Sequence, residues 1–528
     1  MTVNHTAIDI ATMERYEYEW SLVSAVFWLI LWAWSIGYGM SLLLSRCLMS
    51  CKSAVKSSKQ GFWWTVCIGL FMALEFPSWI ASQRPGLADL IVGTDPRLTE
   101  VLKSVPLLTQ GPQPPWLLHN RHIQFIPWMI QNEIHRTVGA IPFQRIHIPV
   151  TDCQRKKHTL GPTQSCPQHE RTMHDTLTVD VFPPFESHDD NNKPLSLNFQ
   201  QFNQSSPVIF FSPGLRCYSQ DLPGNSIVRH AFARGFRSVV FHRRGHTPNQ
   251  PLQSPRWNLF GDVDDFEQVY WYIHDQYLTP TTPLFLHGIS SGTALTVTAL
   301  AKWDQRRVQR DESDIPTNET WNDQRIPSFV ASIKVTPGYD ISKVMTNERF
   351  LFPYQDILLP GVKDHFVLQN EQLLRQHNAT AVDQALAATS LQEFVDATVP
   401  FAGYDSTQAY YHDTNPIHDV RHITTPTLVL NSLDDPCCNI RNLYERGTLA
   451  HHDNKTYAEM IHETHRAIVA VTRTGSHCPF LCTRNKWIPF SRDPLTSYGY
   501  MLHSWADEVA LDYYEAALDV YEDRRLLR

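Results

Sequence analysis

The sequence predicts an α/β protein in which helices cover both faces of a mostly parallel sheet. Between residues 208 and 471, short apolar runs alternate with longer amphipathic stretches, and Gly, Pro and Asp bound the runs. Near-continuous apolarity over a few residues is typical of strands buried on both faces of a parallel sheet. The alternation favours strands connected by helices. The predicted strands are residues 208–211, 238–241, 284–286, 329–335, 427–430 and 467–471.

Composition and charge exclude several classes of protein. Of 528 residues, 42% are hydrophobic and 19% are charged, which fits a folded chain and not a disordered one. The formal net charge of −8 argues against nucleic acid as a partner, because phosphate backbones require a clustered excess of Lys and Arg. The 10 cysteines form no pair of C-x-x-C units, so we expect no metal, and the redox compartment stays open.

Residues 1–85 are predicted to anchor the chain in a membrane. Residues 22–44 carry no charged side chain and are rich in Leu, Ile, Val, Phe and Trp. A transmembrane helix needs about 20 such residues, so this run is predicted to cross the bilayer. A cleaved signal peptide is the alternative, but the run is long, and Glu14, Glu17 and Glu19 precede it where a signal peptide is basic.

A second apolar stretch, residues 62–81, is interrupted by Glu75 and Pro77. A short span, a re-entrant segment and an interfacial helix all remain open for it. The intervening loop has four basic residues and no acid, which favours the cytosol. A second crossing would therefore put the large domain in the lumen or outside the cell, and no second crossing would leave it cytosolic. N-glycosylation sequons at Asn4, Asn203, Asn318, Asn378 and Asn454 favour the lumen, and we expect the endoplasmic reticulum or another endomembrane.

The remaining chain is predicted to hold a linker and one large domain. Residues 86–115 are rich in proline and lack sustained periodicity, which is typical of a linker. Residues 116–528 form the large domain. About 90 residues of helical character separate the strand near 335 from the strand near 427, too many for one crossover helix. We expect a helical cap at about residues 341–420.

Residues 288–292, Gly-Ile-Ser-Ser-Gly, lie between a predicted strand and a helix-forming run. This is the G-x-S-x-G nucleophile elbow of the α/β-hydrolase fold in its required setting. The backbone turns so sharply there that larger residues two positions before and after the serine would collide. The pattern predicts Ser290 as a nucleophile, and a glycine turn with incidental serines is the alternative.

A serine nucleophile needs a base and a residue that orients the base, and in this fold they follow in the order acid, histidine. The predicted strand 427–430 is followed by Asp434 and Asp435, and the strand 467–471 is followed by His477. We predict Ser290, Asp435 and His477 as the triad, with Asp434 as a helper or an alternative acid. A solvated Asp-Asp-Pro turn and a structural histidine are the alternatives.

The developing oxyanion of a tetrahedral intermediate requires two backbone NH groups that already point at it. The residue after the nucleophile, Ser291, is predicted to supply one of them. The other is expected from the loop after strand 208–211, where Gly214 permits a turn and Leu215 can donate its NH.

Several further motifs stand out from about residue 116 onward. They are residues 120–124 (N-R-H-I-Q), 242–245 (H-R-R-G), 393–394, 403–406 (G-Y-D-S), 410–411 and 431–436 (N-S-L-D-D-P). In these motifs the chain resembles the membrane-anchored abhydrolases, a family that includes the yeast medium-chain ethyl-ester synthases and the mammalian abhydrolase-domain phospholipases and acylglycerol lipases. We expect His122, Arg244, Tyr410 and Tyr411 to belong to the framework. The sequence departs from the family at Pro213, where histidine is usual, and at Arg121 and Ser476, where glycine is usual.

The resemblance implies a membrane-anchored serine esterase or lipase that forms an acyl-enzyme on Ser290. Its substrates would be acyl esters, medium-chain or glycerolipid, and it would need no cofactor and no obligate protein partner. Two other functions remain open: an acyltransferase that makes esters from acyl donors and alcohols, and a hydrolase-fold binding protein without turnover.

Overall fold

The computed structural model describes residues 86–114, 116–137, 140–153, 171–185, 202–222, 224–247, 250–312, 325–346, 354–446, 455–483 and 502–522. The predicted membrane segments 22–44 and 62–81 lie outside these ranges. Among the residues described, no helix combines the length and the apolarity needed to cross a bilayer.

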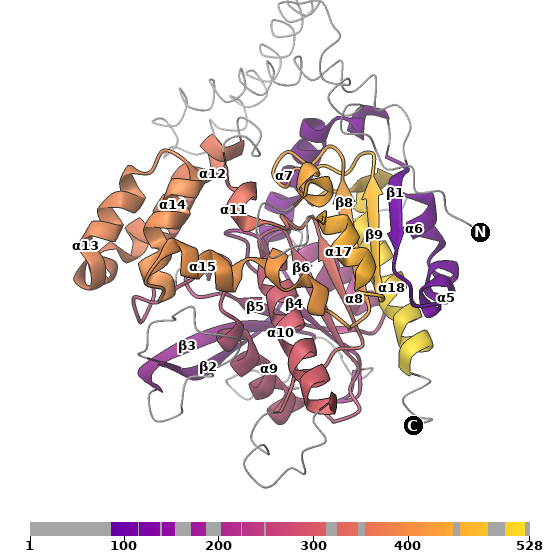
Figure 1. Cartoon of the computed structure of the whole chain (residues 1–528), viewed down its shortest axis with the longest axis horizontal. Helices are drawn as coiled ribbons and strands as arrows, with labels where there is room; N and C mark the ends of the chain where they lie inside the picture. Colours follow the sequence, from indigo (N-terminus) through magenta and orange to yellow (C-terminus); the bar gives the residue numbers. More distant parts are fainter. Residues whose placement is uncertain are drawn as a thin grey trace, which may run out of the picture.

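A nine-stranded sheet in the order β1-β9-β8-β7-β6-β4-β5-β3-β2 forms the centre of the molecule (Figure 1). All six predicted runs are strands of this sheet, they pair in parallel, and every residue in them is buried. They are β4 (Val208–Ser212), β5 (Arg237–His242), β6 (Leu284–Ile289), β7 (Ala331–Val335), β8 (Thr427–Ser432) and β9 (Ala467–Thr472). The predicted α/β-hydrolase fold with a mostly parallel sheet is confirmed.

Antiparallel strands that were not predicted complete both edges. At one edge, β1 (Leu87–Val92) pairs with β9. At the other, β2 (Gln144–Cys153) and β3 (Arg171–Phe182) form a ribbon, and β3 pairs with β5. A separate pair is β10 (Leu481–Thr483) and β11 (Leu502–Ser504).

The prediction of a linker at residues 86–115 is wrong, because this segment is part of the folded domain. Besides β1 it contains helices α5 (Arg97–Ser104) and α6 (Pro106–Gln110). Leu98, Val101 and Leu108 are fully buried in the core beside α18 (Trp505–Glu522). Pro106 stands at the first position of α6, where a proline starts a helix and does not break it.

Helices cover both faces of the sheet. On one face, α5, α8 (Gly224–Ala233) and α18 pack against Ile209, Phe285 and Ile333. On the other, α9 (Val263–Tyr277), α10 (Gly292–Glu312) and α17 (Tyr457–Glu463) pack against Phe210 and Leu286. Alternate strand residues therefore serve the two cores, as a sheet buried on both faces requires.

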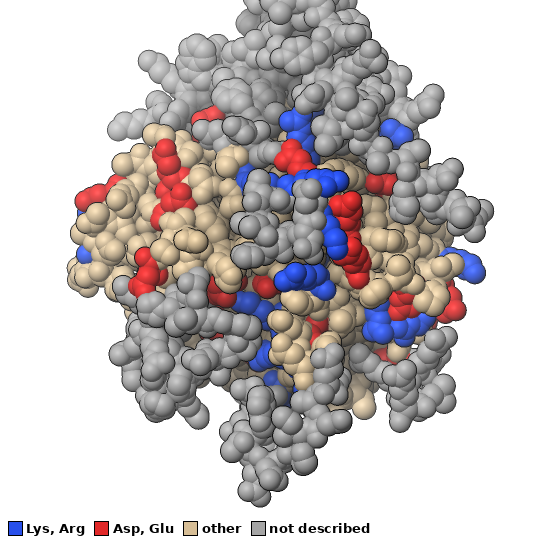
Figure 2. All heavy atoms as spheres, viewed as in Figure 1, with Lys and Arg blue, Asp and Glu red and all other residues tan. Residues whose placement is uncertain are grey.

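The residues between β7 and β8 form a helical layer with a core of its own. In Figure 1 these helices gather at one side of the sheet. Trp257 stacks on Phe366 within this core, with ring centroids 4.9 Å apart. The layer consists of α11 (Ile341–Val344), α12 (Tyr354–Val362), α13 (Glu371–Ala387), α14 (Leu391–Thr398) and α15 (Thr407–Thr414). Elsewhere lie α7 (Arg121–Thr137) and α16 (Arg441–Tyr444). On the face seen in Figure 2, acidic and basic side chains are interspersed.

Lys334, on the central strand β7, is buried, and in the part of the chain that the structure describes it forms no ion pair. Its side chain lines an apolar cavity of about 30 Å³ with Val297, Val429 and Ile461. The Nζ atom has no hydrogen-bond partner within the described ranges. Burial lowers the pKa of Lys334 well below its usual value.

Lys334→Met is expected to stabilise the protein near neutral pH by at least about 2 kcal/mol, because an unpartnered buried amine is removed. Wild-type Lys334 takes up a proton on unfolding, since its folded-state pKa is below the unfolded value. Wild-type stability therefore rises as the pH approaches the ordinary value of 10.5, and the advantage of the variant shrinks. Thermal unfolding midpoints at about pH 7 and about pH 9.5 measure both effects.

The exposed Lys103 on α5 provides the control. Lys103→Met should change stability by less than about 0.5 kcal/mol at either pH. A destabilised Lys334→Met variant would contradict the account of Lys334.

Candidate active site

The nucleophile elbow joins the end of β6 to the start of α10. Ser290 lies between them with φ of 51°, a left-handed conformation that serine adopts only under constraint. A Cβ atom on Gly288 would lie less than 3.0 Å from Thr296 Oγ1, and one on Gly292 would lie less than 3.0 Å from the Ser212 carbonyl oxygen. The two glycines are therefore required by close packing, and the turn presents the Ser290 hydroxyl beyond the end of β6.

Three loops, which follow β6, β8 and β9 at the carboxyl ends of the parallel strands, bring the predicted triad together. The distance between Ser290 Oγ and His477 Nε2 is 2.7 Å. On the other side of the imidazole, His477 Nδ1 lies 2.9 Å from Asp435 Oδ2 and 3.0 Å from Oδ1. Since a carboxylate only accepts, Nδ1 carries the proton and Nε2 is free to accept the serine proton.

The Asp435 carboxylate is buried and fixed in place. Its Oδ1 atom accepts the backbone NH groups of Cys437 and Cys438, each at 2.8 Å. Burial disfavours the charged imidazole, but the charge of Asp435, together with the neighbouring Cys478, Cys437 and Cys438, raises the pKa of His477 well above its usual value. The arrangement favours the imidazolium that forms when the histidine takes a proton.

Asp434 has a different position from Asp435. Its Oδ1 atom accepts the backbone NH groups of Gly475 at 3.0 Å and Ser476 at 2.8 Å, together with the Ser432 hydroxyl. Burial raises the pKa of Asp434 to about 6. Asp434 thus holds the turn that precedes His477, and the geometry favours Asp435 as the partner of the imidazole.

The predicted oxyanion loop lies directly over the nucleophile. A Cβ atom on Gly214 would be 3.3 Å from Ser290 Cβ and 3.7 Å from its Oγ. In the described part of the chain, the backbone NH groups of Leu215 and Ser291 donate to no protein acceptor. Ser291 follows Ser290 directly, and Leu215 follows Gly214, which contacts Ser290, so both predicted donors belong to segments that adjoin the nucleophile.

Arg243, which was not predicted as a site residue, fastens this loop to the elbow. Its Nη2 atom donates to the carbonyl oxygens of Pro213 at 3.0 Å and Gly214 at 2.7 Å. Both terminal nitrogens contact Ser291 Oγ, at 3.3 and 3.2 Å, and Nη1 also donates to the Leu259 carbonyl at 3.1 Å. No carboxylate pairs with Arg243 among the described residues. Burial lowers its pKa to about 10, so the guanidinium stays charged at neutral pH.

Arg243→Met is expected to lower kcat by about 10- to 100-fold, because the loop that carries one oxyanion donor loses its tether. KM should change much less, since the interaction matters for the transition state. Arg243→Lys should recover part of the loss, because an ammonium reaches fewer of these acceptors. Steady-state kinetics on a soluble acyl ester measures the effect, and an unchanged kcat in folded Arg243→Met would contradict the assignment.

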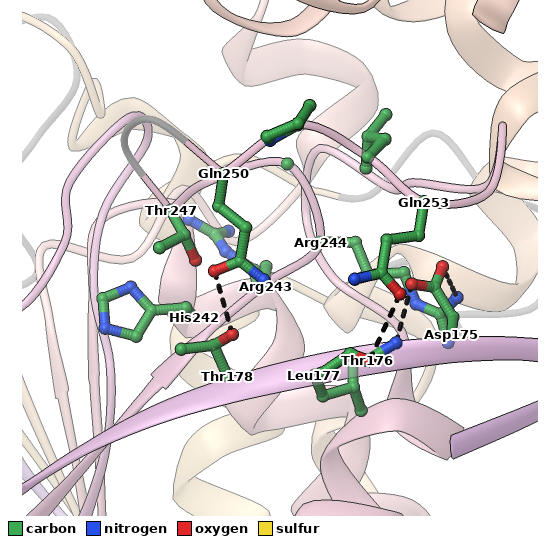
Figure 3. Close-up of a pocket in the computed structure, with 13 residues that line it drawn as sticks. Asp175, Thr176, Leu177, Thr178, His242, Arg243, Arg244, Thr247, Gln250 and Gln253 are labelled. Atoms are coloured by element: carbon green, nitrogen blue, oxygen red, sulfur yellow. Dashed lines mark hydrogen bonds and ion pairs between the residues drawn. The ribbon is translucent and has the colours of Figure 1, made fainter. Parts of the chain in front are cut away.

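The neighbouring motif residue Arg244 has a structural role, as expected. It forms buried ion pairs with Asp175 at 2.8 Å and Asp265 at 2.7 Å. Figure 3 shows Arg244 beside Asp175 in a polar cavity of about 20 Å³ between β3 and the segment after β5. Tyr410 donates to Asn258 inside the helical layer, and His122 contacts Tyr354. These contacts join elements of the framework and do not reach the triad.

One group of potential metal ligands lies within the described residues. The ligand atoms of Asp435, Cys437 and His477 are all within 4.8 Å of one another. The sequence spacing did not reveal this group, because it combines the loop after β8 with the loop after β9.

No protein-family model matches the chain. It is 25% identical to the monoacylglycerol lipase ABHD2 of Danio rerio over 426 residues, 78% of this chain and 79% of the relative. It is 26% identical to the phospholipase ABHD3 of Mus musculus over 230 residues, 43% of this chain and 50% of the relative. Protein ABHD15 of Homo sapiens is 25% identical over 308 residues, 56% of this chain and 53% of the relative. The chain thus spans about half the length of the latter two.

Among solved structures, the carboxylesterase EstE1 matches with a TM-score of 0.36 and 13% identity, over 76% of this chain and 97% of that one. The assignment of the fold rests on the strand order and the elbow. The membrane anchor and the likeness to the yeast synthases stay predictions. The sequence relatives confirm the resemblance to the abhydrolase-domain lipases and phospholipases, and with it the prediction that this chain is a hydrolase of the α/β-hydrolase class.

Proposed function

We propose that the protein is a serine ester hydrolase that cleaves acyl esters through an acyl-enzyme on Ser290. The observation that carries the proposal is the continuous contact from Ser290 Oγ through the His477 imidazole to the Asp435 carboxylate. The free NH groups beside Ser290 add the second requirement of acyl transfer.

The reaction uses groups of this chain alone. His477 Nε2 takes the proton of the Ser290 hydroxyl while Oγ bonds to the acyl carbonyl carbon. The NH groups of Leu215 and Ser291 hold the resulting oxyanion. The imidazolium then gives its proton to the departing alcohol, which leaves the acyl-enzyme. In the second half a water molecule gives a proton to His477 and attacks the acyl carbon. The bond from this carbon to Ser290 Oγ then breaks, the imidazolium returns the proton to Oγ, and the acid leaves.

The proposed substrates are lipid acyl esters, medium-chain esters or glycerolipids. Two relatives are named as a monoacylglycerol lipase and a phospholipase. In this chain, Leu215 of the oxyanion loop packs against the apolar core of the helical layer. An acyl chain bound at Ser290 would therefore lie beside apolar side chains. We further propose that residues 22–44 anchor the enzyme in an endomembrane, where such lipids are at hand.

A fluorophosphonate probe and product analysis test the function. Full-length protein in detergent micelles should be labelled when folded and not after denaturation. With monoacylglycerol or phospholipid it should release free fatty acid. Mostly ester as product, with ethanol or glycerol present, would favour an acyltransferase. No labelling of folded protein would overturn the proposal and favour a binding protein. Glycan occupancy at Asn318 and Asn454 fixes the side of the membrane.

A further inference from the structure

Thiol groups cluster around the imidazole of the triad. Cys437 and Cys438 follow Asp435, and Cys478 follows His477. All three are buried and free of disulfides. The Cys438 side chain lies close enough to His477 for the two groups to interact. The proposed hydrolysis uses none of these sulfur atoms.

The cluster contains the nitrogen, oxygen and sulfur ligands that zinc prefers. The ligand atoms of Asp435, Cys437 and His477 lie within 4.8 Å of one another. Ligand atoms around a tetrahedral zinc ion lie about 3.2–3.8 Å apart, so small side-chain movements close the gap. Cys438 stands beside the same imidazole as a further candidate ligand.

We propose that Asp435, Cys437 and His477 form an inhibitory site for Zn²⁺ that overlaps the catalytic triad. The metal site stands on the ligand geometry, whereas its inhibitory effect rests on the proposed function. The His477 side chain is 14% exposed, so an ion can reach the site from the side of the substrate. Water or the Cys438 sulfur would complete the coordination.

Zinc binding stops catalysis whichever nitrogen it takes. At Nδ1, zinc displaces the hydrogen bond to Asp435, and the ring proton moves to Nε2. A protonated Nε2 cannot accept the Ser290 proton. At Nε2, zinc occupies the lone pair that the serine needs. Cys437 binds as the thiolate and releases one proton to solvent, so the exchange is balanced.

Inhibition is measured on full-length protein in detergent micelles, without chelators. Micromolar Zn²⁺ should inhibit ester hydrolysis reversibly, and EDTA should restore the rate. The half-inhibitory concentration should rise at least tenfold in Cys437→Ser and further in Cys437→Ser/Cys438→Ser, each relative to its own zinc-free rate. Cys482→Ser is the matched control, because this buried cysteine lies on β10, and it should match the wild type. Equal zinc sensitivity in all of these proteins would overturn the inference.

Cobalt binding tests the site without turnover. The inactive Ser290→Ala protein with Co²⁺ should show a thiolate-to-cobalt charge-transfer band that Cys437→Ser/Cys438→Ser in the same background lacks. The absence of this band would contradict the metal site and would leave the proposed hydrolase function unaffected. A band in Ser290→Ala together with wild-type protein that hydrolyses no ester would instead count against the proposed function alone. If a cysteine-to-serine protein does not fold, Cys437→Ala replaces it in both measurements.

Discussion

Ser290→Ala is expected to lower kcat for ester hydrolysis by about 10⁴- to 10⁶-fold and to abolish labelling by a fluorophosphonate. The reason is that Ser290 Oγ is the oxygen within 2.7 Å of the imidazole and lies at the tip of the elbow. A residual rate above the uncatalysed reaction should remain, because the oxyanion donors are backbone groups that the substitution does not remove. Burst and steady-state kinetics with a chromogenic ester measure both quantities.

Ser291→Ala is the matched control for this prediction. It removes a neighbouring hydroxyl and keeps the backbone NH, so labelling should persist and kcat should fall by less than about tenfold. That small loss would come from the contacts of Arg243 with Ser291 Oγ. If the labelling moved to Ser291 in Ser290→Ala, or if Ser290→Ala kept its activity, Ser290 would not be the nucleophile.

The central strands were predictable because burial on both faces leaves a direct mark on the sequence. Each of the six runs is apolar at nearly every position, and each is a strand with every residue buried. The edge strands lack this mark. In β2, buried Ile146, Ile148 and Val150 alternate with exposed residues, and β1 is mostly half-buried. Half-buried segments that contain prolines, such as Pro149 in β2, resemble loops.

The ends of exposed helices are also hard to predict from the sequence. The residues from 304 onward are mostly polar and look like a surface loop, yet α10 continues to Glu312. Arg306 and Arg307 form ion pairs with Glu267 and Asp304 there, so charged side chains support the last turns. Polarity alone does not separate an exposed helix from a loop.

The triad residues could be named from the sequence because the fold fixes their order after known strands. The supporting contacts could not be named, because they join loops that are distant in the chain. Arg243 follows β5 yet binds the loop after β4 and the elbow after β6. Cys437 and His477 follow different strands, β8 and β9, and meet only beyond the carboxyl ends of these strands. The sequence favoured Asp435 as the acid but kept Asp434 as an alternative, since the two residues are adjacent.

Asp435→Asn is expected to lower kcat by about 10⁴-fold, because an amide does not hold the imidazole in the tautomer with a free Nε2. Asp434→Asn should lower kcat by less than about tenfold, since an amide oxygen can still accept the NH groups of Gly475 and Ser476. Steady-state kinetics of the two variants at one pH makes the comparison. Similar losses in both variants would mean that the two carboxylates share the role.

The two substitutions should also separate in their effect on stability. The pKa of Asp434 is raised to about 6 from an ordinary value of 3.8, so the folded wild type loses stability as the pH rises through this interval. Asp434→Asn carries no such charge, and its stability relative to the wild type should increase from about pH 4 to about pH 7. Urea unfolding at both pH values measures the change. A difference that shrinks with rising pH would show that the carboxylate of Asp434 is stabilised in the folded protein, and that its contacts with the turn before His477 outweigh its burial.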